Sequence, residues 1–352
     1  MEAERYLDNL IAEGFLKKCS DIHFHPTNND IEVFFRVDGL LKRDHTLKRE
    51  DALKVYSRIK VLSNLDITRN RHPQQGSFKL EGKQSVDVRV STINTVWGEK
   101  LVLRLFPYSP EFSTFEALGM EAFQISEINK LLNIRGGLIL VCGPTGSGKT
   151  TTLYTMANQL YDESVNIVTI EDPVEYKVPH FTQIDVAEEL GLDFSPLLTS
   201  VLRQDPDIII IGEVRNAKTA QIAIRAALTG HTVLASVHTE DTLSSIDRFI
   251  NLDVNPAIFA EAFRGALAQR LIRIKSRDDE YRGRTGIFEV LLKDENLKSY
   301  ILKRDQKAVS KVREKLFCLK QAAHSKKCQN ITDKKEINRV LGVFKNEGKA
   351  SN

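Results

Sequence analysis

An eight-residue segment, GPTGSGKT at 143–150, matches the pattern G-x-x-x-x-G-K-[ST] at every fixed position. Its glycines allow backbone N–H groups to converge on phosphate oxygens. Lys149 would add a positive charge at the β and γ phosphates of a nucleotide, and the hydroxyl of Thr150 would bind Mg²⁺. An apolar run precedes the segment and a helix-compatible run, 151–160, follows it, as a phosphate-binding loop requires. The residues expected to bind the nucleotide are Gly143, Pro144, Thr145, Gly146, Ser147, Gly148, Lys149, Thr150 and Thr151.

A carboxylate suited to a nucleotide site closes the apolar run DIIIIGE at 207–213. In P-loop enzymes the strand beside the phosphate loop delivers such a group to the metal or to its water. We therefore expect Glu213 to reach Mg²⁺ directly or through water, and we expect Asp207, at the start of the run, to be structural. The alternative is a core strand that ends in a surface glutamate.

Two further segments place polar groups after apolar runs. The sequence IEDPVE puts Glu171, Asp172 and Glu175 after a run at 166–170, where carboxylates could polarise a water or hold a metal-bound water. An acidic surface loop is the alternative. His238 follows a run at 232–236 and is interpreted as a sensor of the γ-phosphate or as a structural histidine.

The first hundred residues predict a small α+β unit. Apolar residues at helical spacing predict a helix over 4–18, and strands are expected at 31–37, 86–90 and 101–106. In the second of these strands the valines alternate with Asp87 and Arg89, so one face should be buried.

The remainder predicts an α/β domain. Residues 114–133 look helical, and four short apolar runs, at 138–142, 166–170, 207–211 and 232–236, are typical of strands buried on both faces of a mainly parallel sheet. Mostly helices are expected from about 283 onward. The predicted organisation is an N-terminal α+β domain at 1–106, a linker at 107–112, a P-loop domain at 113–292 and a helical, basic region at 293–352.

Composition limits the function classes. Lys and Arg number 50 and Asp and Glu 47, a net charge of +3, which argues against a protein that coats nucleic acid. The basic excess lies within 302–348, on solvated helix faces or on a surface that docks to an acidic partner or to anionic lipid headgroups. The four cysteines form no CxxC pair, the N-terminal segment MEAERYLDNL lacks the apolar core of a secretory signal, and no apolar run approaches the length of a bilayer span.

Four segments in this order, GPTGSGKTTTLY, IEDPVEY, LRQDPDIIIIGEVR and TGHTVLASVHT, resemble the secretion ATPases of type II secretion, type IV pili and competence, the GspE/PilB/PilT type. The segments CSDIHFHP, FRVDG, VDVRVST and GEKLVLRL resemble the N-terminal domain of that family. The segments AQRL and GRTGIFEVL resemble its C-terminal region. The resemblance covers roughly residues 18 to 292.

This resemblance implies a RecA-like P-loop NTPase core, preceded by a small PAS-like α+β domain and followed by a helical C-terminal region. It assigns Lys149 and Thr150 to Walker A and Glu213 to Walker B. It makes Glu175, rather than Glu171, the catalytic glutamate, and it places His238 in a His box. Arg89 and Arg104 match arginines that approach the nucleotide phosphates from the N-terminal domain. The family forms hexameric rings with nucleotide between the two domains, so hydrolysis would rotate one domain against the other.

Two departures from the family pattern indicate which members of the family the chain resembles most. The interval IRIKSRDDEYR at 272–282 lacks the four-cysteine knuckle of many assembly ATPases, so no zinc is expected. Many assembly ATPases also carry a long additional N-terminal domain, whereas this sequence starts close to the segment CSDIHFHP, so the resemblance implies a short form of the family. The chain is therefore most similar to the competence pseudopilus assembly ATPases of Gram-positive bacteria, the ComG type, and partly to the retraction ATPases of type IV pili.

The expected function is a cytoplasmic, Mg²⁺-dependent ATP-hydrolysing motor, peripheral on the inner face of the cell membrane. It would act through an integral-membrane platform protein to assemble a competence pseudopilus for DNA uptake, without direct nucleic acid binding. Pilus retraction or type II secretion, a nucleotide-gated scaffold with little turnover, and a DNA-translocating motor are the alternatives.

Overall fold

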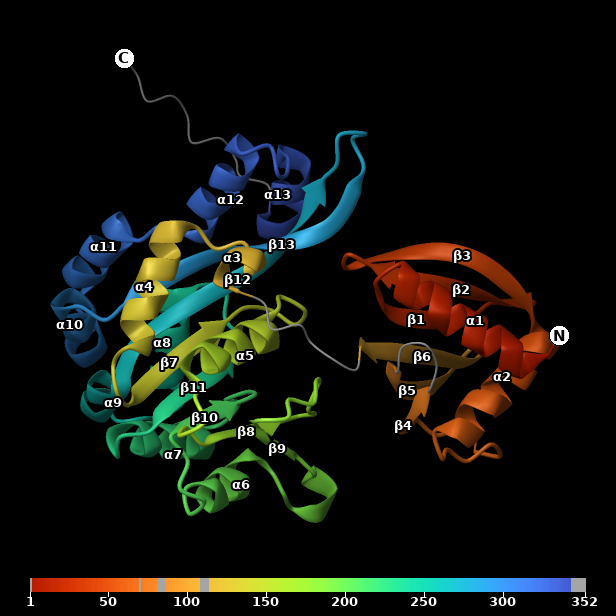
Figure 1. Cartoon of the computed structure of the whole chain (residues 1–352), viewed down its shortest axis with the longest axis horizontal. Helices are drawn as coiled ribbons and strands as arrows, with labels where there is room; N and C mark the ends of the chain where they lie inside the picture. The colour runs from red at the N-terminus through yellow and green to blue at the C-terminus, as the bar shows by residue number, and fades with distance from the viewer. Residues whose placement is uncertain (1, 70, 81–85, 108–113, 343–352) are drawn as a thin grey trace. The chain divides into compact units, whose positions relative to one another are not determined.

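The computed structural model describes residues 2–69, 71–80, 86–107 and 114–342 (Figure 1). The chain divides into two compact units, unit 1 at Met1–Pro110 and unit 2 at Glu111–Asn352. A linker was expected at 107–112, and residues 108–112 of it lie outside the described residues. Each unit is described by itself.

Unit 1 is a six-stranded antiparallel sheet with two helices, α1 (Ala3–Leu16) and α2 (Arg49–Leu62). The strand order is β3-β2-β1-β6-β5-β4. The strands are β1 (Cys19–Pro26), β2 (Asp30–Val37), β3 (Leu40–Lys48), β4 (Gln74–Leu80), β5 (Val86–Thr95) and β6 (Gly98–Pro107). Apolar residues from both helices and from alternate strand positions share one core.

The α+β character predicted for the first hundred residues is confirmed. Val86, Val88 and Val90 are buried as their alternation predicted, and the expected strands at 31–37 and 101–106 lie within β2 and β6. The sequence analysis missed α2, β1, β3 and β4. The strand β3 explains this: most of its residues are exposed and polar, so it pairs with β2 without an apolar signature.

Unit 2 contains a seven-stranded sheet with the order β13-β12-β7-β11-β10-β8-β9. All neighbours are parallel except β12 and β13. The strands are β7 (Gly137–Cys142), β8 (Ile167–Glu171), β9 (Thr182–Asp185), β10 (Ile208–Ile211), β11 (Thr232–Val237), β12 (Phe263–Lys275) and β13 (Tyr281–Leu292). The four predicted apolar strands are β7, β8, β10 and β11, and their parallel pairing is confirmed.

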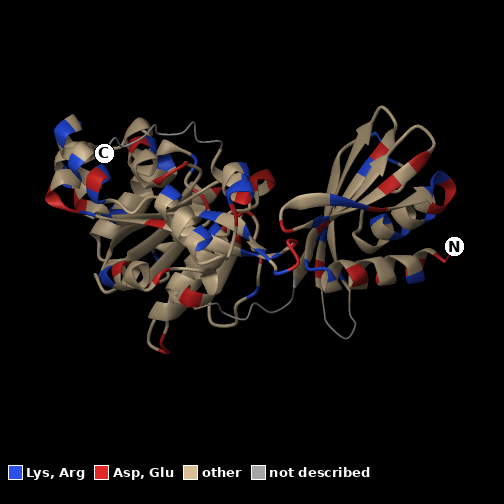
Figure 2. Ribbon diagram, turned by 90° about the horizontal axis from the view of Figure 1, so that it is seen from above, with Lys and Arg blue, Asp and Glu red and all other residues tan. Residues whose placement is uncertain are grey.

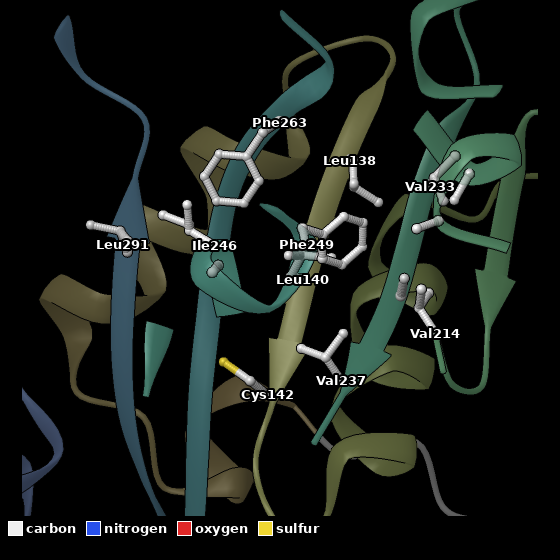
Figure 3. Close-up of a cluster of buried hydrophobic side chains, with 14 of the residues drawn as sticks. Leu138, Leu140, Cys142, Val214, Val233, Val237, Ile246, Phe249, Phe263 and Leu291 are labelled. Atoms are coloured by element: carbon white, nitrogen blue, oxygen red, sulfur yellow. The ribbon is translucent and has the colours of Figure 1, made fainter. Parts of the chain in front are cut away.

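Helices cover both faces of this sheet, because successive strand residues enter different cores. One core contains Ile139 and Val141 of β7 together with α3 (Phe115–Leu118), α4 (Ala122–Leu132) and α5 (Lys149–Leu160). The other contains Leu138 and Leu140 of β7 beside Phe249 (Figure 3). Its helices are α6 (Phe194–Val201), α7 (Ala217–Leu228), α8 (Thr242–Asn251), α9 (Pro256–Ala262), α10 (Glu295–Lys303), α11 (Gln306–Lys315), α12 (Leu319–Cys328) and α13 (Lys334–Leu341).

The expectation of mostly helices from about residue 283 is wrong for its first ten residues. The segment GRTGIFEVLL forms most of β13, because its apolar residues pair antiparallel with β12 and enter both cores. From 295 onward the described chain is helical, with α10 to α13.

Several basic residues of the C-terminal helices face solvent, whereas Lys326 of α12 is buried and lies 3.4 Å from Glu121 Oε1. Lys307 and Lys311 of α11 are exposed, opposite the buried Val309 and Val312. Lys and Arg are interspersed with Asp and Glu over both units (Figure 2). Residues 343–348 of the expected basic stretch lie outside the described residues. Among the residues that the structure describes, no helix combines the length and apolar composition needed to cross a bilayer.

Candidate nucleotide-binding site

The segment 143–150 forms a tight loop between the buried strand β7 and the first turn of α5. Gly146 and Gly148 have φ angles of +76° and +91°, a region that favours glycine. A Cβ atom at Gly143 would lie 2.5 Å from Ser147 Oγ. Since α5 begins at Lys149, its first N–H groups have no acceptor within the helix and face the loop.

Two side chains of the loop fit an anionic ligand. Ser147 Oγ is buried and has no hydrogen-bond partner within the described part of the chain. Such a group costs about 1–3 kcal/mol, which a phosphate oxygen that accepts from it would offset. Lys149 Nζ donates to the carbonyl oxygens of Gly143 at 2.9 Å and Pro144 at 3.1 Å. The loop therefore fits the phosphates of a nucleotide.

The charges of two acidic residues act on the Lys149 ammonium. Burial lowers its pKa, whereas the charges of Glu213 and Glu175 oppose that shift. Both carboxylates therefore favour the charged form of the lysine. Glu213 Oε2 accepts from Arg215 Nε at 2.8 Å and lies 3.6 Å from His238 Nε2. Unit 2 therefore brings the predicted residues Glu213 and His238 together, and the charges of Glu213 and Glu175 act on Lys149.

The route by which Glu213 reaches the loop differs from the expectation. The strand that precedes it, β10, is not the neighbour of β7, because β11 lies between them. His238 directly follows β11 and therefore stands between the loop and Glu213. Burial and the charge of Lys149 lower the pKa of His238, and Glu213 opposes them.

The three acids of IEDPVE have separate environments. Glu171 is buried and accepts from Tyr154 Oη at 2.6 Å and from Thr169 Oγ1 at 2.7 Å. Asp172 pairs with Arg215 Nη1 at 3.1 Å, and Glu175 is half-buried in the loop that follows β8. Glu171 is thus held by hydrogen bonds inside unit 2, and Glu175 remains the predicted catalytic glutamate.

Asp207 has the structural contact that was expected of it. Its carboxylate accepts from the backbone N–H of Asn166 at 2.8 Å, at the end of the sheet where β8 and β10 begin. It therefore lies at the opposite strand end from Glu213.

The chain alone supplies few ligands for a metal. Thr150 and Thr151 are half-buried on the first turn of α5. The described residues contain no group of three or more His, Cys, Asp or Glu side chains that could hold a metal ion. Mg²⁺ at nucleotide sites is usually held by one or two protein groups together with phosphates and water. Thr150 and Glu213 could be these protein groups.

The sequence analysis missed the support that β12 gives to the loop. Gln269 is buried, and its Oε1 accepts from Thr152 Oγ1 at 2.7 Å, across 117 residues of chain. A Cβ atom at Gly148 would lie 2.9 Å from Gln269 Nε2. Arg270 donates to the carbonyl oxygen of Glu240 at 2.7 Å, and burial lowers its pKa. Both belong to the AQRL segment, whose only signal was the family resemblance.

The two arginines expected at the phosphates belong to unit 1. Arg89 of β5 and Arg104 of β6 are directly opposite in the ladder. Arg104 Nε donates to Asp21 Oδ1 at 2.8 Å, and Arg36 Nε lies 3.7 Å from Asp21 Oδ2. The guanidinium of Arg89 lies 4.8 Å from the centre of the Phe106 ring. Three arginines and one buried aspartate therefore follow one row across β2, β1, β6 and β5.

The strand order of unit 2, with a phosphate-binding loop after β7 and an acidic residue after β10, defines a RecA-like P-loop nucleoside triphosphatase core. The sequence model of the type II/IV secretion system protein family matches residues 2–339, and the chain belongs to that family. The family resemblance found in the sequence is thereby confirmed.

Individual proteins of secretion and pilus systems are similar to the chain in sequence. The chain is 38% identical to the type II secretion system protein HxcR of Pseudomonas aeruginosa, over 84% of this chain and 68% of that protein. It is 38% identical to a HofB homolog of Haemophilus influenzae, over 96% and 73%. It is 40% identical to the type IV pilus assembly ATPase PilB of Thermus thermophilus, over 77% and 31%.

Solved structures have the same fold. The pilus retraction motor PilT with bound ADP matches with a TM-score of 0.68 and 26% identity, over 93% of this chain and 94% of that one. The ATPase DotB of Legionella pneumophila matches with a TM-score of 0.76 and 21% identity, over 95% and 94%, and at that identity the match concerns the fold alone.

Proposed function

We propose that the chain is an ATP-hydrolysing motor of a secretion or pilus machine. The observation that carries the proposal is the loop between β7 and α5, which ends in Lys149 and contains the buried Ser147 Oγ, together with the Glu213–His238 pair that follows β10 and β11, in a member of the type II/IV secretion family. A scaffold that only binds nucleotide would not require both Glu175 and Glu213.

Each residue of the site has a role in the proposed hydrolysis of ATP. The loop amides and Lys149 bind the phosphates, and Thr150 and Glu213 would hold Mg²⁺ directly or through water. The metal would neutralise charge on the β and γ phosphates. Glu175 accepts the proton of the attacking water, and His238 responds to the γ-phosphate through its contact with Glu213. Arg89 and Arg104 stabilise the charge of the transition state.

Within this class we place the chain as the assembly motor of a competence pseudopilus that serves DNA uptake. It would work as a homohexamer on the cytoplasmic face of the membrane, through an integral-membrane platform protein and without binding DNA itself. Similarity to PilB and the lack of cysteine at 272–282 support this choice. Retraction is the second candidate, because the PilT structure covers nearly the whole chain.

Hydrolysis of ATP by the purified chain, with and without Mg²⁺, tests the class. We expect Lys149→Ala to reduce kcat by about 100-fold or more, since it removes the fixed cation at the phosphates. The exposed Lys218→Ala in α7 removes one charge from the same unit and should leave the rate unchanged. Failure of the folded protein to bind Mg-ATP at millimolar ligand would refute the motor. Tight binding without hydrolysis, even with the platform protein, would favour the scaffold.

Deletion of the gene separates the two motor directions. Loss of pilus fibres and of DNA uptake would support assembly, whereas excess fibres would support retraction. Salt-sensitive binding of DNA by the isolated protein would instead favour a DNA-translocating motor.

A further inference from the structure

Three polar side chains from α5, β8 and β9 meet beneath the loop that carries Glu175. Tyr154 Oη lies 2.6 Å and 2.7 Å from the two carboxylate oxygens of Glu171. Gln183 Nε2 donates to Tyr154 Oη at 2.9 Å. Tyr154 and Glu171 are both almost fully buried, at 3% and 4% exposed. The helix that begins at Lys149 is thus hydrogen-bonded to the strand that precedes the acidic loop.

The strand β9 holds this loop on both sides of Glu175. Gln183 Nε2 donates to the carbonyl oxygen of Tyr176 at 2.8 Å, and Gln183 Oε1 accepts from the N–H of Val178 at 2.6 Å. Asp185 Oδ1 accepts from the N–H of Val174 at 2.6 Å. Val174 and Tyr176 are the chain neighbours of Glu175, so its backbone is fixed before and after.

The geometry points to Tyr154, Glu171, Gln183 and Asp185 as positioning residues for ATP hydrolysis, which set the place of Glu175 relative to Lys149. This inference rests on the proposed function, in which Glu175 is the base. A base displaced by about 1 Å can lose a factor of 10² in rate, although nucleotide binding by the loop is unaffected. The first acid of IEDPVE therefore has a part in the site as the buried anchor of the second.

The test uses the full chain with Mg-ATP. We expect Gln183→Ala and Tyr154→Phe to lower kcat by about 10-fold to 100-fold. The KM for ATP and the Kd of a non-hydrolysable ATP analogue should change by less than about 2-fold, because the loop amides and Lys149 keep their contacts. Glu171→Gln keeps an oxygen that can accept from Tyr154 and should retain more activity than Glu171→Ala.

Tyr161→Phe is the matched control. Tyr161 follows the last residue of α5, its ring lies 4.1 Å from that of His180, and its hydroxyl makes no hydrogen bond to the described part of the chain. Its loss should leave kcat unchanged. Amide hydrogen exchange supplies a readout apart from activity: the N–H of Val178 should exchange faster in Gln183→Ala than in Tyr161→Phe.

Two results would overturn the inference. One is full kcat in Gln183→Ala while Glu175→Gln is inactive, in which case the proposed function stands and the positioning role does not. The other is an analogue Kd weakened tenfold or more in Gln183→Ala and Tyr154→Phe, which would indicate general loosening of the site. Full activity in Glu175→Gln would instead remove the base from the proposed function itself.

Discussion

At the scale of residues, two charged side chains of the site, Arg215 and Glu213, each contact more than one partner. Arg215 lies between the carboxylates of Asp172 and Glu213, and Glu213 in turn faces His238. The acidic loop after β8 and the acid after β10 therefore share a cation. Removal of either acid should alter the position of the other.

We predict that Glu213→Gln lowers kcat about 100-fold while ATP still binds, because the carboxylate acts on the metal and its water more than on the phosphates. The measurement is steady-state hydrolysis beside analogue binding. Glu188→Gln is the control, because the Glu188 side chain is 66% exposed and its carboxylate is as far as 4.0 Å from Arg215 Nη1. An unchanged rate in Glu213→Gln would remove this residue from the mechanism.

The residues of the loop and the acids after the strands could be predicted because their types and spacing are local in the chain. Gln269 and Tyr154 could not be. Each is a single polar residue in a buried segment, and its partner is supplied by another element, in the case of Gln269 by a residue 117 positions away. No periodicity marks such a pair.

At the scale of elements, one buried carboxylate attaches the last described helix to the sheet. Glu336 of α13 is fully buried and accepts from Arg273 of β12 at 2.6 Å and from Arg339 at 2.6 Å. Burial alone would raise the pKa of Glu336, but the hydrogen bonds from Arg339 and Arg273 outweigh it and lower the pKa to about 2.

We predict that Glu336→Gln destabilises unit 2 by about 3–5 kcal/mol, because it leaves a largely buried Arg273 without its counter-charge. Chemical denaturation measures the change. Glu314→Gln in α11, an exposed residue, should have little effect.

The same pair has a defined pH dependence. A carboxyl group whose pKa is depressed by folding stabilises the protein above its unfolded pKa and loses that contribution as the pH falls. We therefore expect the difference between wild type and Glu336→Gln to be constant above about pH 5 and to shrink between about pH 4.5 and pH 2. A difference that stays constant down to pH 2 would contradict this assignment.

Helices and strands could be predicted where the apolar residues form a continuous run or a regular alternation. The strands β7, β10 and β11 are continuous apolar runs and were found, and β5 was found by alternation. The pair β12 and β13 was not recognised, because buried polar residues such as Gln269 interrupt the apolar pattern of β12. The position of β11 between β7 and β10 follows from pairing across the sheet, which the order of the segments along the chain does not specify.

At the scale of the whole molecule, each unit has cores of its own. The core of unit 1 is formed by α1, α2 and the antiparallel sheet, and the two cores of unit 2 lie on either side of its parallel sheet. The phosphate-binding loop belongs to unit 2 alone.

We therefore predict two calorimetric transitions. An ATP analogue at 100 times its Kd should stabilise the transition of unit 2 by about 2.7 kcal/mol, since it binds the native state only. Lys149→Ala should abolish this shift. A single transition that shifts as one would show that the units unfold together.

The chain has a single tryptophan, Trp97, which is 51% exposed at the turn between β5 and β6. Indole emission therefore arises from unit 1 alone, whereas the nucleotide loop is in unit 2. An emission change on addition of ATP would report a signal that has passed from one unit to the other, without any attached dye.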